Sequence, residues 1–219
     1  GSTLYGMNST RRVTLNMMMN HGYATIKKIK KSVSIIDMPF KTYENPRQAL
    51  YNARKLINYT KANLIKLELS KKKLPILKYL IKNKINVVAH IGVTPQSYKN
   101  FSNIKIVGKN EAERQSLKKL ALDAEFAGAE FILLECVTEQ TAKIITSSVS
   151  IPTIGIGASK YCDGQILVFD DLVNMTFNKN KPKFVKSYMN FSKEAKRAIK
   201  KYTREVELGK FPGKKYTYR

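Results

Sequence analysis

The 219-residue sequence has few cysteines, few acidic residues and no long apolar run. Two cysteines, Cys136 and Cys162, are too few for a disulfide scaffold in a chain of this size, and they fit a reducing, cytoplasmic environment. No stretch approaches 18 consecutive apolar residues, and the opening GSTLYGMNSTRR lacks the apolar core of a secretory signal. The composition therefore predicts a soluble cytoplasmic protein with no membrane partner.

Acidic residues number 16 against 40 Lys and Arg, so the formal net charge is +24. Such a charge can indicate a nucleic-acid partner, because basic side chains neutralise phosphates. However, only eight of the basic residues are Arg, the residue suited to bidentate phosphate and guanine contacts, and the lysines are scattered through every segment. We therefore interpret the charge as a dispersed, solvated basic surface. A basic binding protein remains an open alternative.

Short apolar runs alternate with amphipathic segments along the chain. In residues 45–61, apolar side chains recur at helical spacing. Asn110 is placed to cap a following helix, with Glu113 three residues later as in a capping box. The last long helix is expected to stop near Gly209. Alternating strands and helices of this length predict an α/β fold with a parallel sheet. Its six expected strands are at roughly 33–38, 63–69, 86–92, 130–136, 151–157 and 165–170.

Polar residues lie toward the carboxyl ends of four of these strands, namely Asp37, Glu68, His90 and Glu135. In a (β/α)8 TIM barrel these strand ends converge on one mouth, where the active site is built. An open sheet would spread several of them apart. The pattern therefore favours a barrel.

A barrel needs eight strands, and the sequence predicts six. The segment before residue 32 is typical of a loop and a helix rather than of two strands. We therefore expect the chain to form a single barrel domain over residues 1–219 that lacks its N-terminal strand-helix-strand, with a C-terminal helix and tail at 192–219.

Paired acids at strand ends suit Mg²⁺, which binds through one or two carboxylates with water and substrate as further ligands. Asp37 and Glu68 are the candidate metal ligands, and Lys66, two residues before Glu68, is a candidate for holding a substrate carboxylate. Glu135 lies in the apolar run FILLEC and is a candidate general base. For the carboxylates, ion pairs with nearby lysines remain an alternative. For His90, a packing or hydrogen-bonding role remains equally open.

Eight blocks, in order along the chain, resemble the ketopantoate hydroxymethyltransferase (3-methyl-2-oxobutanoate hydroxymethyltransferase) family. The resemblance extends from about residue 3 to residue 213, and a colinear set is far more specific than any one block. The blocks are DMPF (37–40), KLE (66–68), HIGVTPQS (90–97), LECV (134–137), IPTIGIGA (151–158), DGQILV (163–168), PKFVK (182–186) and FPG (211–213).

The resemblance implies a (β/α)8 barrel that makes 2-dehydropantoate from 3-methyl-2-oxobutanoate and 5,10-methylenetetrahydrofolate in pantothenate biosynthesis. By position, Asp37 and Glu68 match the family's Mg²⁺ ligands, Asp37 and Lys66 its substrate contacts, and Glu135 its proton acceptor. His90 is expected to line the mouth. The family also implies a homo-oligomer, commonly a decamer.

The sequence departs from the family pattern in two places near this site. The usual Gly-Asp-Ser-Leu segment, which supplies a further metal ligand and a substrate contact, is expected before the first residue given. After Glu68 the usual Gly-Gly is Leu69-Ser70. Two alternatives therefore stay open, namely a related barrel enzyme acting on phosphoenolpyruvate or small keto acids, and an inactive remnant.

Overall fold

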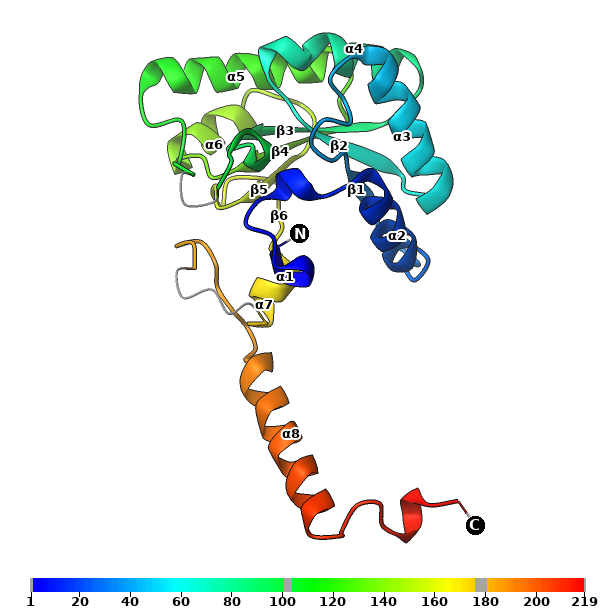
Figure 1. Ribbon diagram of the computed structural model, residues 1–219. Coiled ribbons are helices and arrows are strands. Elements are labelled where there is room, and N and C mark those ends of the chain that lie inside the picture. The colour runs from blue at the N-terminus through cyan, green and yellow to red at the C-terminus, as the bar shows by residue number, and fades with distance from the viewer. Residues whose placement is uncertain (1, 101–103, 176–180, 219) are drawn as a thin grey trace. The chain divides into compact units, whose positions relative to one another are not determined.

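The computed structural model describes residues 2–100, 104–175 and 181–218. The chain divides into two compact units, residues 1–166 and 167–219, which are described separately (Figure 1). The expectation of one barrel domain over residues 1–219 stays a prediction. Among the described helices, none combines the length and the apolar character that crossing a bilayer requires.

A single parallel sheet forms the centre of the first unit (Figure 1). Its strands lie side by side in the order in which they occur in the chain, so each crossover connects neighbouring strands. The predicted parallel α/β class is confirmed, whereas closure into an eight-stranded barrel stays a prediction. The strands are β1 (Ile35–Asp37), β2 (Leu64–Glu68), β3 (Val87–Gly92), β4 (Phe131–Glu135), β5 (Thr153–Ile156) and β6 (Gly164–Gln165).

A helix connects each pair of consecutive strands from β1 to β5, and one long helix dominates the second unit. The α-helices are α1 (Ser2–Tyr5), α2 (Leu15–Ile26), α3 (Pro46–Thr60), α4 (Leu74–Lys82), α5 (Glu111–Phe126), α6 (Glu139–Thr146), α7 (Phe169–Leu172) and α8 (Phe191–Glu207). Short 3-10 turns are η1 (Thr10–Arg12), η2 (Lys71–Lys73), η3 (Pro95–Ser97) and η5 (Lys214–Tyr216).

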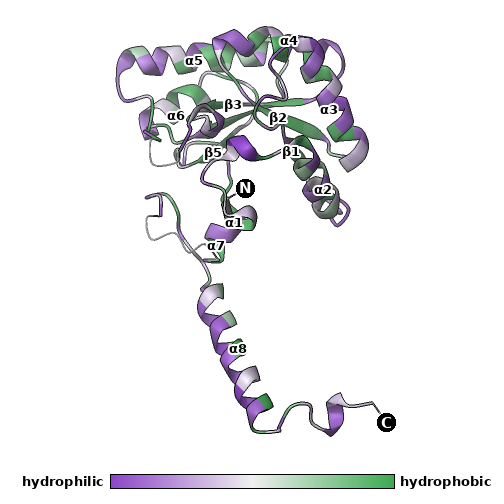
Figure 2. Ribbon diagram, in the orientation of Figure 1, coloured by the Kyte–Doolittle hydropathy of each residue, from purple (hydrophilic) through white to green (hydrophobic). Residues whose placement is uncertain are grey.

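The two faces of the sheet differ in chemistry because side chains alternate along each strand. One face is apolar and packs with α3, α4, α5 and α6 into the core. Figure 2 shows strands β1 to β3 as hydrophobic, whereas α8 is mainly hydrophilic. The alternate residues on the other face include the polar ones of the predicted site. The strand residues of the apolar face include Ile36, Ile65, Leu67, Val87, Ala89, Ile91, Ile132 and Leu134, all buried.

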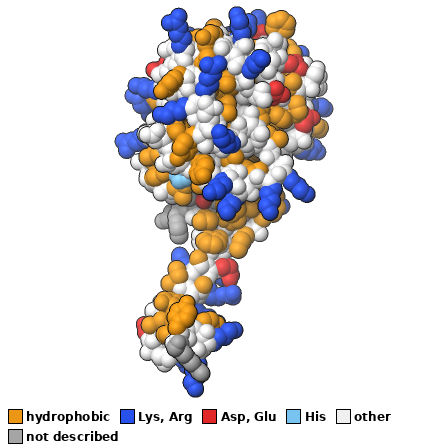
Figure 3. All heavy atoms as spheres, turned by 90° about the vertical axis from the view of Figure 1, so that its right-hand side faces the viewer, with side chains coloured by type: hydrophobic (Ala, Val, Ile, Leu, Met, Phe, Trp, Pro, Cys, Tyr) orange, Lys and Arg blue, Asp and Glu red, His pale blue; other side chains and the backbone are white. Residues whose placement is uncertain are grey.

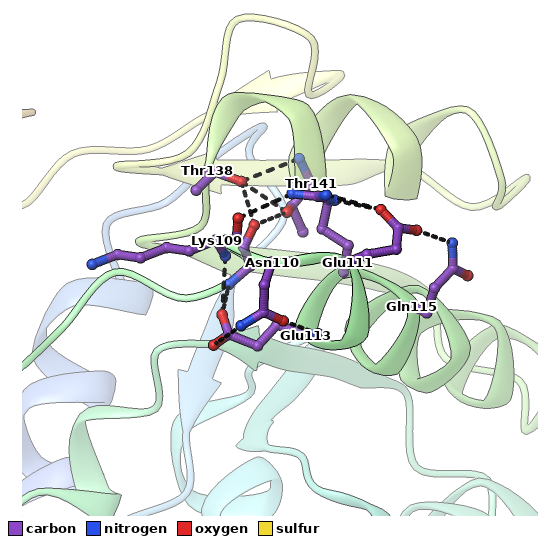
Figure 4. Close-up of polar contacts among 9 residues, drawn as sticks. Lys109, Asn110, Glu111, Glu113, Gln115, Thr138 and Thr141 are labelled. Carbon is purple, nitrogen blue, oxygen red and sulfur yellow. Dashed lines mark hydrogen bonds and ion pairs between the residues drawn. The ribbon is translucent and has the colours of Figure 1, made fainter.

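Helix α5 begins with the cap predicted from the sequence (Figure 4). Asn110 Oδ1 accepts a hydrogen bond from the Glu113 backbone N–H at 2.9 Å. Glu113 reaches back to the backbone N–H groups of Gly108 and Lys109, at 2.7 and 2.9 Å, rather than to that of Asn110. The carboxylate accepts hydrogen bonds from these two backbone N–H groups, and the positive end of the helix dipole stabilises its negative charge.

The sixth expected strand, 165–170, is largely wrong. Strand β6 spans only Gly164–Gln165, and Phe169–Leu172 is helical. The apolar run before Asp170 favoured a strand, but Asp170 and Asp171 lie in the first turn of α7, where acidic side chains stabilise a helix.

The end of α8 is confirmed close to its predicted place. The helix is capped at Leu208, and Gly209 follows with a φ of +64°. This left-handed conformation is the usual one for a glycine that ends a helix.

Lysine and arginine side chains are spread singly over the molecular face drawn in Figure 3. Hydrophobic and neutral side chains separate them on that face, so they do not form one continuous basic stripe there. A stripe or patch is the usual mark of a nucleic-acid-binding surface. This face therefore fits the dispersed basic surface predicted from the composition.

Gly92, at the end of β3, allows close contact between β3 and β4. Its φ is +98°, and a Cβ there would lie 2.8 Å from Val137 Cγ1 and would overlap the Glu135 carbonyl oxygen. We expect Gly92→Ala to lower the free energy of unfolding by about 3 kcal/mol, from backbone strain and steric overlap together. Urea denaturation measures this loss.

Gly6 provides the matched control for Gly92. It also has a positive φ, +60°, but a Cβ added there would meet no atom of the described residues within 4 Å. Gly6→Ala should therefore cost only the strain, about 1 kcal/mol. Equal losses in the two variants would contradict the overlap at Gly92.

Candidate active site

The register of the sheet brings the predicted site residues to one face. Asp37 pairs with Lys66 across β1 and β2, Glu68 pairs with His90 across β2 and β3, and Glu135 pairs with the last residue of β3. Paired residues of a parallel sheet point to the same side, as do residues two apart on one strand. All five side chains therefore project from the polar face, at the carboxyl ends of four neighbouring strands.

Four of these residues, Asp37, Lys66, His90 and Glu135, form a continuous series of contacts that we call the polar ladder. Lys66 Nζ lies 2.6 Å from Asp37 Oδ1 and 3.4 Å from His90 Nδ1. The other ring nitrogen of His90, Nε2, lies 3.2 Å from Glu135 Oε2. The ladder crosses four strands, with an acid at each end and Lys66 and His90 between them, so each acid has a basic neighbour.

Burial differs along the polar ladder. The His90 side chain is 1% exposed, whereas those of Lys66, Glu135 and Asp37 are 18%, 21% and 38% exposed. The acids at the two ends are therefore open to solvent and to a ligand, while the imidazole between Lys66 and Glu135 is enclosed.

Glu68 is held by the turn η3 rather than by the polar ladder. Its Oε1 and Oε2 accept the Gln96 backbone N–H at 2.9 and 3.1 Å. The Gln96 side chain accepts from Tyr43 Oη at 2.7 Å and donates to the Met38 carbonyl at 2.9 Å. Gln96 therefore connects Glu68 with the segment that follows β1.

The electrostatics of the two acids suit a bound cation. Burial raises the pKa of Glu68 to about 7, and the nearby Asp37 charge also raises it. Asp37 Oδ1 is buried and receives no aligned hydrogen bond from the described residues, although Lys66 Nζ lies 2.6 Å away. A cation near both carboxylates would favour the ionised form of Glu68.

The number of candidate protein ligands also fits Mg²⁺. Within the described ranges, no group of three or more His, Cys, Asp or Glu side chains gathers around one point. This arrangement would not suit a structural zinc site, which takes four protein ligands. Two carboxylates suit Mg²⁺, which usually keeps several waters and binds through one or two carboxylates and its substrate.

The sequence reasoning missed Gln96 and Tyr43 as parts of this site. Both are buried, with exposed fractions of 7% and 2%. Burial and the nearby Glu68 charge raise the pKa of Tyr43, so it remains a neutral donor to Gln96. The TPQS block was noted only as a family resemblance. Nothing in its spacing indicates that its glutamine bonds to groups 28 and 58 residues away.

Removing the Gln96 side chain should destabilise the fold. Gln96→Ala leaves Tyr43 Oη and the Met38 carbonyl without their partner, while the backbone contact to Glu68 remains. We expect a loss of about 2 to 3 kcal/mol in the free energy of unfolding, because buried polar groups lose their bonds. Urea denaturation measures this loss.

Tyr43→Phe is the matched control for Gln96→Ala, because it removes only one of the two side-chain bonds. It should cost about 1 kcal/mol. A Gln96→Ala loss no larger than that of the control would show that the bond to Met38 contributes nothing.

Solved structures with a similar fold are distant in sequence. A putative phosphonomutase from Burkholderia cenocepacia J2315 superposes with a TM-score of 0.55 at 12% identity, covering 90% of this chain and 79% of that one. Oxaloacetate acetylhydrolase in complex with the product oxalate gives 0.54 at 10% identity, covering 95% and 81%. At this identity the similarity supports the parallel α/β fold alone.

Closer relatives match the whole of this chain and about four fifths of their own length. The 3-methyl-2-oxobutanoate hydroxymethyltransferase of Pelagibacter ubique is 49% identical over the whole of this chain and 83% of its own. The enzyme of that name from Clostridium botulinum (strain Langeland) is 41% identical over the whole of this chain and 80% of its own. The sequence profile of ketopantoate hydroxymethyltransferase matches residues 1–214. The chain therefore belongs to the ketopantoate hydroxymethyltransferase family.

Proposed function

We propose that this protein forms 2-dehydropantoate from 3-methyl-2-oxobutanoate and 5,10-methylenetetrahydrofolate, the first committed step of pantothenate biosynthesis. The observation that carries the proposal is the polar ladder, in a chain of this family. The ladder supplies a carboxylate base, a cation for the substrate and an acid for a metal ion on one face of the sheet. Glu68 lies on the same face and pairs with His90 across β2 and β3.

Lys66 is the substrate-binding cation in this proposal. Its side chain is partly buried, and its ammonium group lies 2.6 Å from the Asp37 carboxylate, so this position beside Lys66 accommodates a carboxylate. The carboxylate of the keto acid would bind beside it, where partial burial strengthens the attraction. Asp37 completes this contact region from the neighbouring strand.

Asp37 and Glu68 would hold Mg²⁺. When bound, the ion supplies a Lewis acid that draws electrons toward the keto oxygen and lowers the free energy of the enolate. Asp37 offers the oxygen without an aligned hydrogen bond, and Glu68 is held by Gln96 against rotation away from the site.

Glu135 is the proton acceptor. As a carboxylate it removes the proton from C3 of the keto acid, and the electrons of that C–H bond pass into the enolate. The enolate carbon then forms the new C–C bond with the one-carbon unit of the folate, and water supplies the oxygen of the hydroxymethyl group. Both C–N bonds between that unit and the folate break, and the two folate nitrogens take up the proton removed from C3 and one proton of the water, so the products are 2-dehydropantoate and tetrahydrofolate.

We also propose that the sheet is part of a (β/α)8 barrel. Six parallel strands in consecutive order, with the site at their carboxyl ends, support this arrangement. A homo-oligomeric state, commonly decameric in the family, rests on the family resemblance, and a cytoplasmic location rests on the low cysteine content.

Product formation tests the proposed activity. The protein is incubated with Mg²⁺, 5,10-methylenetetrahydrofolate and 3-methyl-2-oxobutanoate, and 2-dehydropantoate is measured by mass spectrometry. Phosphoenolpyruvate and oxaloacetate serve as control substrates for a related barrel enzyme. The proposal predicts product from 3-methyl-2-oxobutanoate, and turnover of a control substrate alone would overturn it.

A further inference from the structure

His90 lies between the proposed substrate-binding lysine and the proposed base. Its two ring nitrogens have different partners, with Nδ1 3.4 Å from Lys66 Nζ and Nε2 3.2 Å from Glu135 Oε2. The side chain is 1% exposed, so solvent offers neither nitrogen an alternative partner. The imidazole therefore lies in contact with both groups.

These partners determine the tautomer of the ring. A lysine ammonium has only donors, so Nδ1 must accept from Lys66 and carries no proton. In the neutral ring the proton is then on Nε2, which faces the Glu135 carboxylate at 3.2 Å, although the two groups are not aligned as a hydrogen bond in this structure. Burial lowers the pKa of His90, and the Lys66 charge lowers it further against the opposing effect of Glu135, which favours the neutral ring.

Glu135 needs such a partner to keep its orientation. Among the described residues, His90 is the only one that bonds to or ion-pairs with the Glu135 side chain. A glutamate that is 21% exposed and free to rotate samples many rotamers, and proton transfer requires the carboxylate in one of them.

We propose that His90 is the positioning residue of Glu135, donating from Nε2 to the base while accepting at Nδ1 from Lys66. This inference rests on the proposed function. The ring fixes the base relative to the substrate-binding lysine, so that the C3 proton of a bound 2-keto acid meets the carboxylate. It takes no part in the transfer of the proton itself.

Two amide variants separate the two contacts of the ring. Glutamine places its terminal NH₂ near the position of Nε2 and can still donate to Glu135. Asparagine places its amide near the position of Nδ1, so its oxygen can accept from Lys66, but the contact with Glu135 is lost. Both are neutral and polar, so a purely structural role of His90 predicts similar losses in His90→Gln and His90→Asn.

The C3 hydrogen exchange of 3-methyl-2-oxobutanoate in deuterated water, without folate, reports the function of the base. We expect His90→Asn to lower the maximal exchange rate by about 10- to 100-fold, which corresponds to the free energy of a hydrogen bond to a charged group. The KM for the keto acid should stay unchanged. His90→Gln should lower the rate by less than about 10-fold. Equal rates in both variants, or a change confined to KM, would overturn the inference.

The tautomer can be measured without any turnover. The chain has two histidines, His21 and His90, so a His21→Gln protein carries only the ring of interest. Two-bond ¹H–¹⁵N spectra of this protein distinguish a protonated ring nitrogen from an unprotonated one. We expect a protonated Nε2 and an unprotonated Nδ1. The opposite tautomer, or two protonated nitrogens at neutral pH, would overturn the inference.

The two experiments distinguish this inference from the proposed function. If the unsubstituted protein exchanges no C3 hydrogen, the proposed function fails, and the spectra still decide the tautomer. If it exchanges hydrogen and His90→Asn does so equally fast, the positioning role fails and the proposed function stands.

Discussion

Glu135→Gln should reduce C3 hydrogen exchange by at least about a hundredfold, because the amide cannot accept the proton. The amide has the shape of the carboxylate, and its oxygen can still accept from His90 Nε2, which lies 3.2 Å from Glu135 Oε2. The fold should therefore persist. Exchange is followed by the loss of the C3 proton signal of 3-methyl-2-oxobutanoate in deuterated water with Mg²⁺.

Mg²⁺ binding provides the internal check on Glu135→Gln. The proposed metal ligands are Asp37 and Glu68, so calorimetric titration of the variant with Mg²⁺ should give an affinity close to that of the unsubstituted protein. Glu139→Gln makes the same chemical change at an exposed position four residues later, in α6, and should leave exchange intact. Loss of metal binding in Glu135→Gln would contradict its assignment as the base.

Asp37→Asn should weaken Mg²⁺ binding by at least about a hundredfold. Changing a group that only supports a metal ligand typically costs 10- to 100-fold in affinity, and a direct ligand should cost at least as much. The substitution also leaves Lys66 without the carboxylate 2.6 Å from its Nζ, which adds repulsion for the cation. Calorimetric titration at constant ionic strength measures the change.

Glu130→Gln is the charge-matched control for Asp37→Asn. Glu130 is exposed and precedes β4, so it lies at the end of the strand opposite to the site, and its loss changes the net charge by the same amount. Its Mg²⁺ affinity should stay the same. A similar loss in both variants would show that net charge rather than a site at Asp37 determines binding.

The strands that carry the site were predictable because their apolar runs are bounded by turn residues. Five of the six expected strands overlap β1 to β5 closely, and Lys66 and Glu68 on β2 share one face as the period of two requires. The sixth failed because an apolar run alone does not distinguish a strand from the start of a helix such as α7.

The contacts within the site were not predictable from one strand at a time. That His90 meets both Lys66 and Glu135 depends on the register between β2, β3 and β4, and no pattern within a strand determines register. The role of Gln96 depends on the path of the turn η3, which brings a backbone N–H to Glu68. Such loop contacts leave no periodic signal in the sequence.

The most direct test of the proposed chemistry is folate-independent exchange by the protein itself. The protein is mixed with 3-methyl-2-oxobutanoate in deuterated water, with Mg²⁺ or with a chelator, and the C3 proton signal is followed. A base and two metal-binding acids on one face predict exchange that requires both the protein and Mg²⁺. Absence of exchange with Mg²⁺ present, or an equal rate with the chelator, would contradict the proposed function.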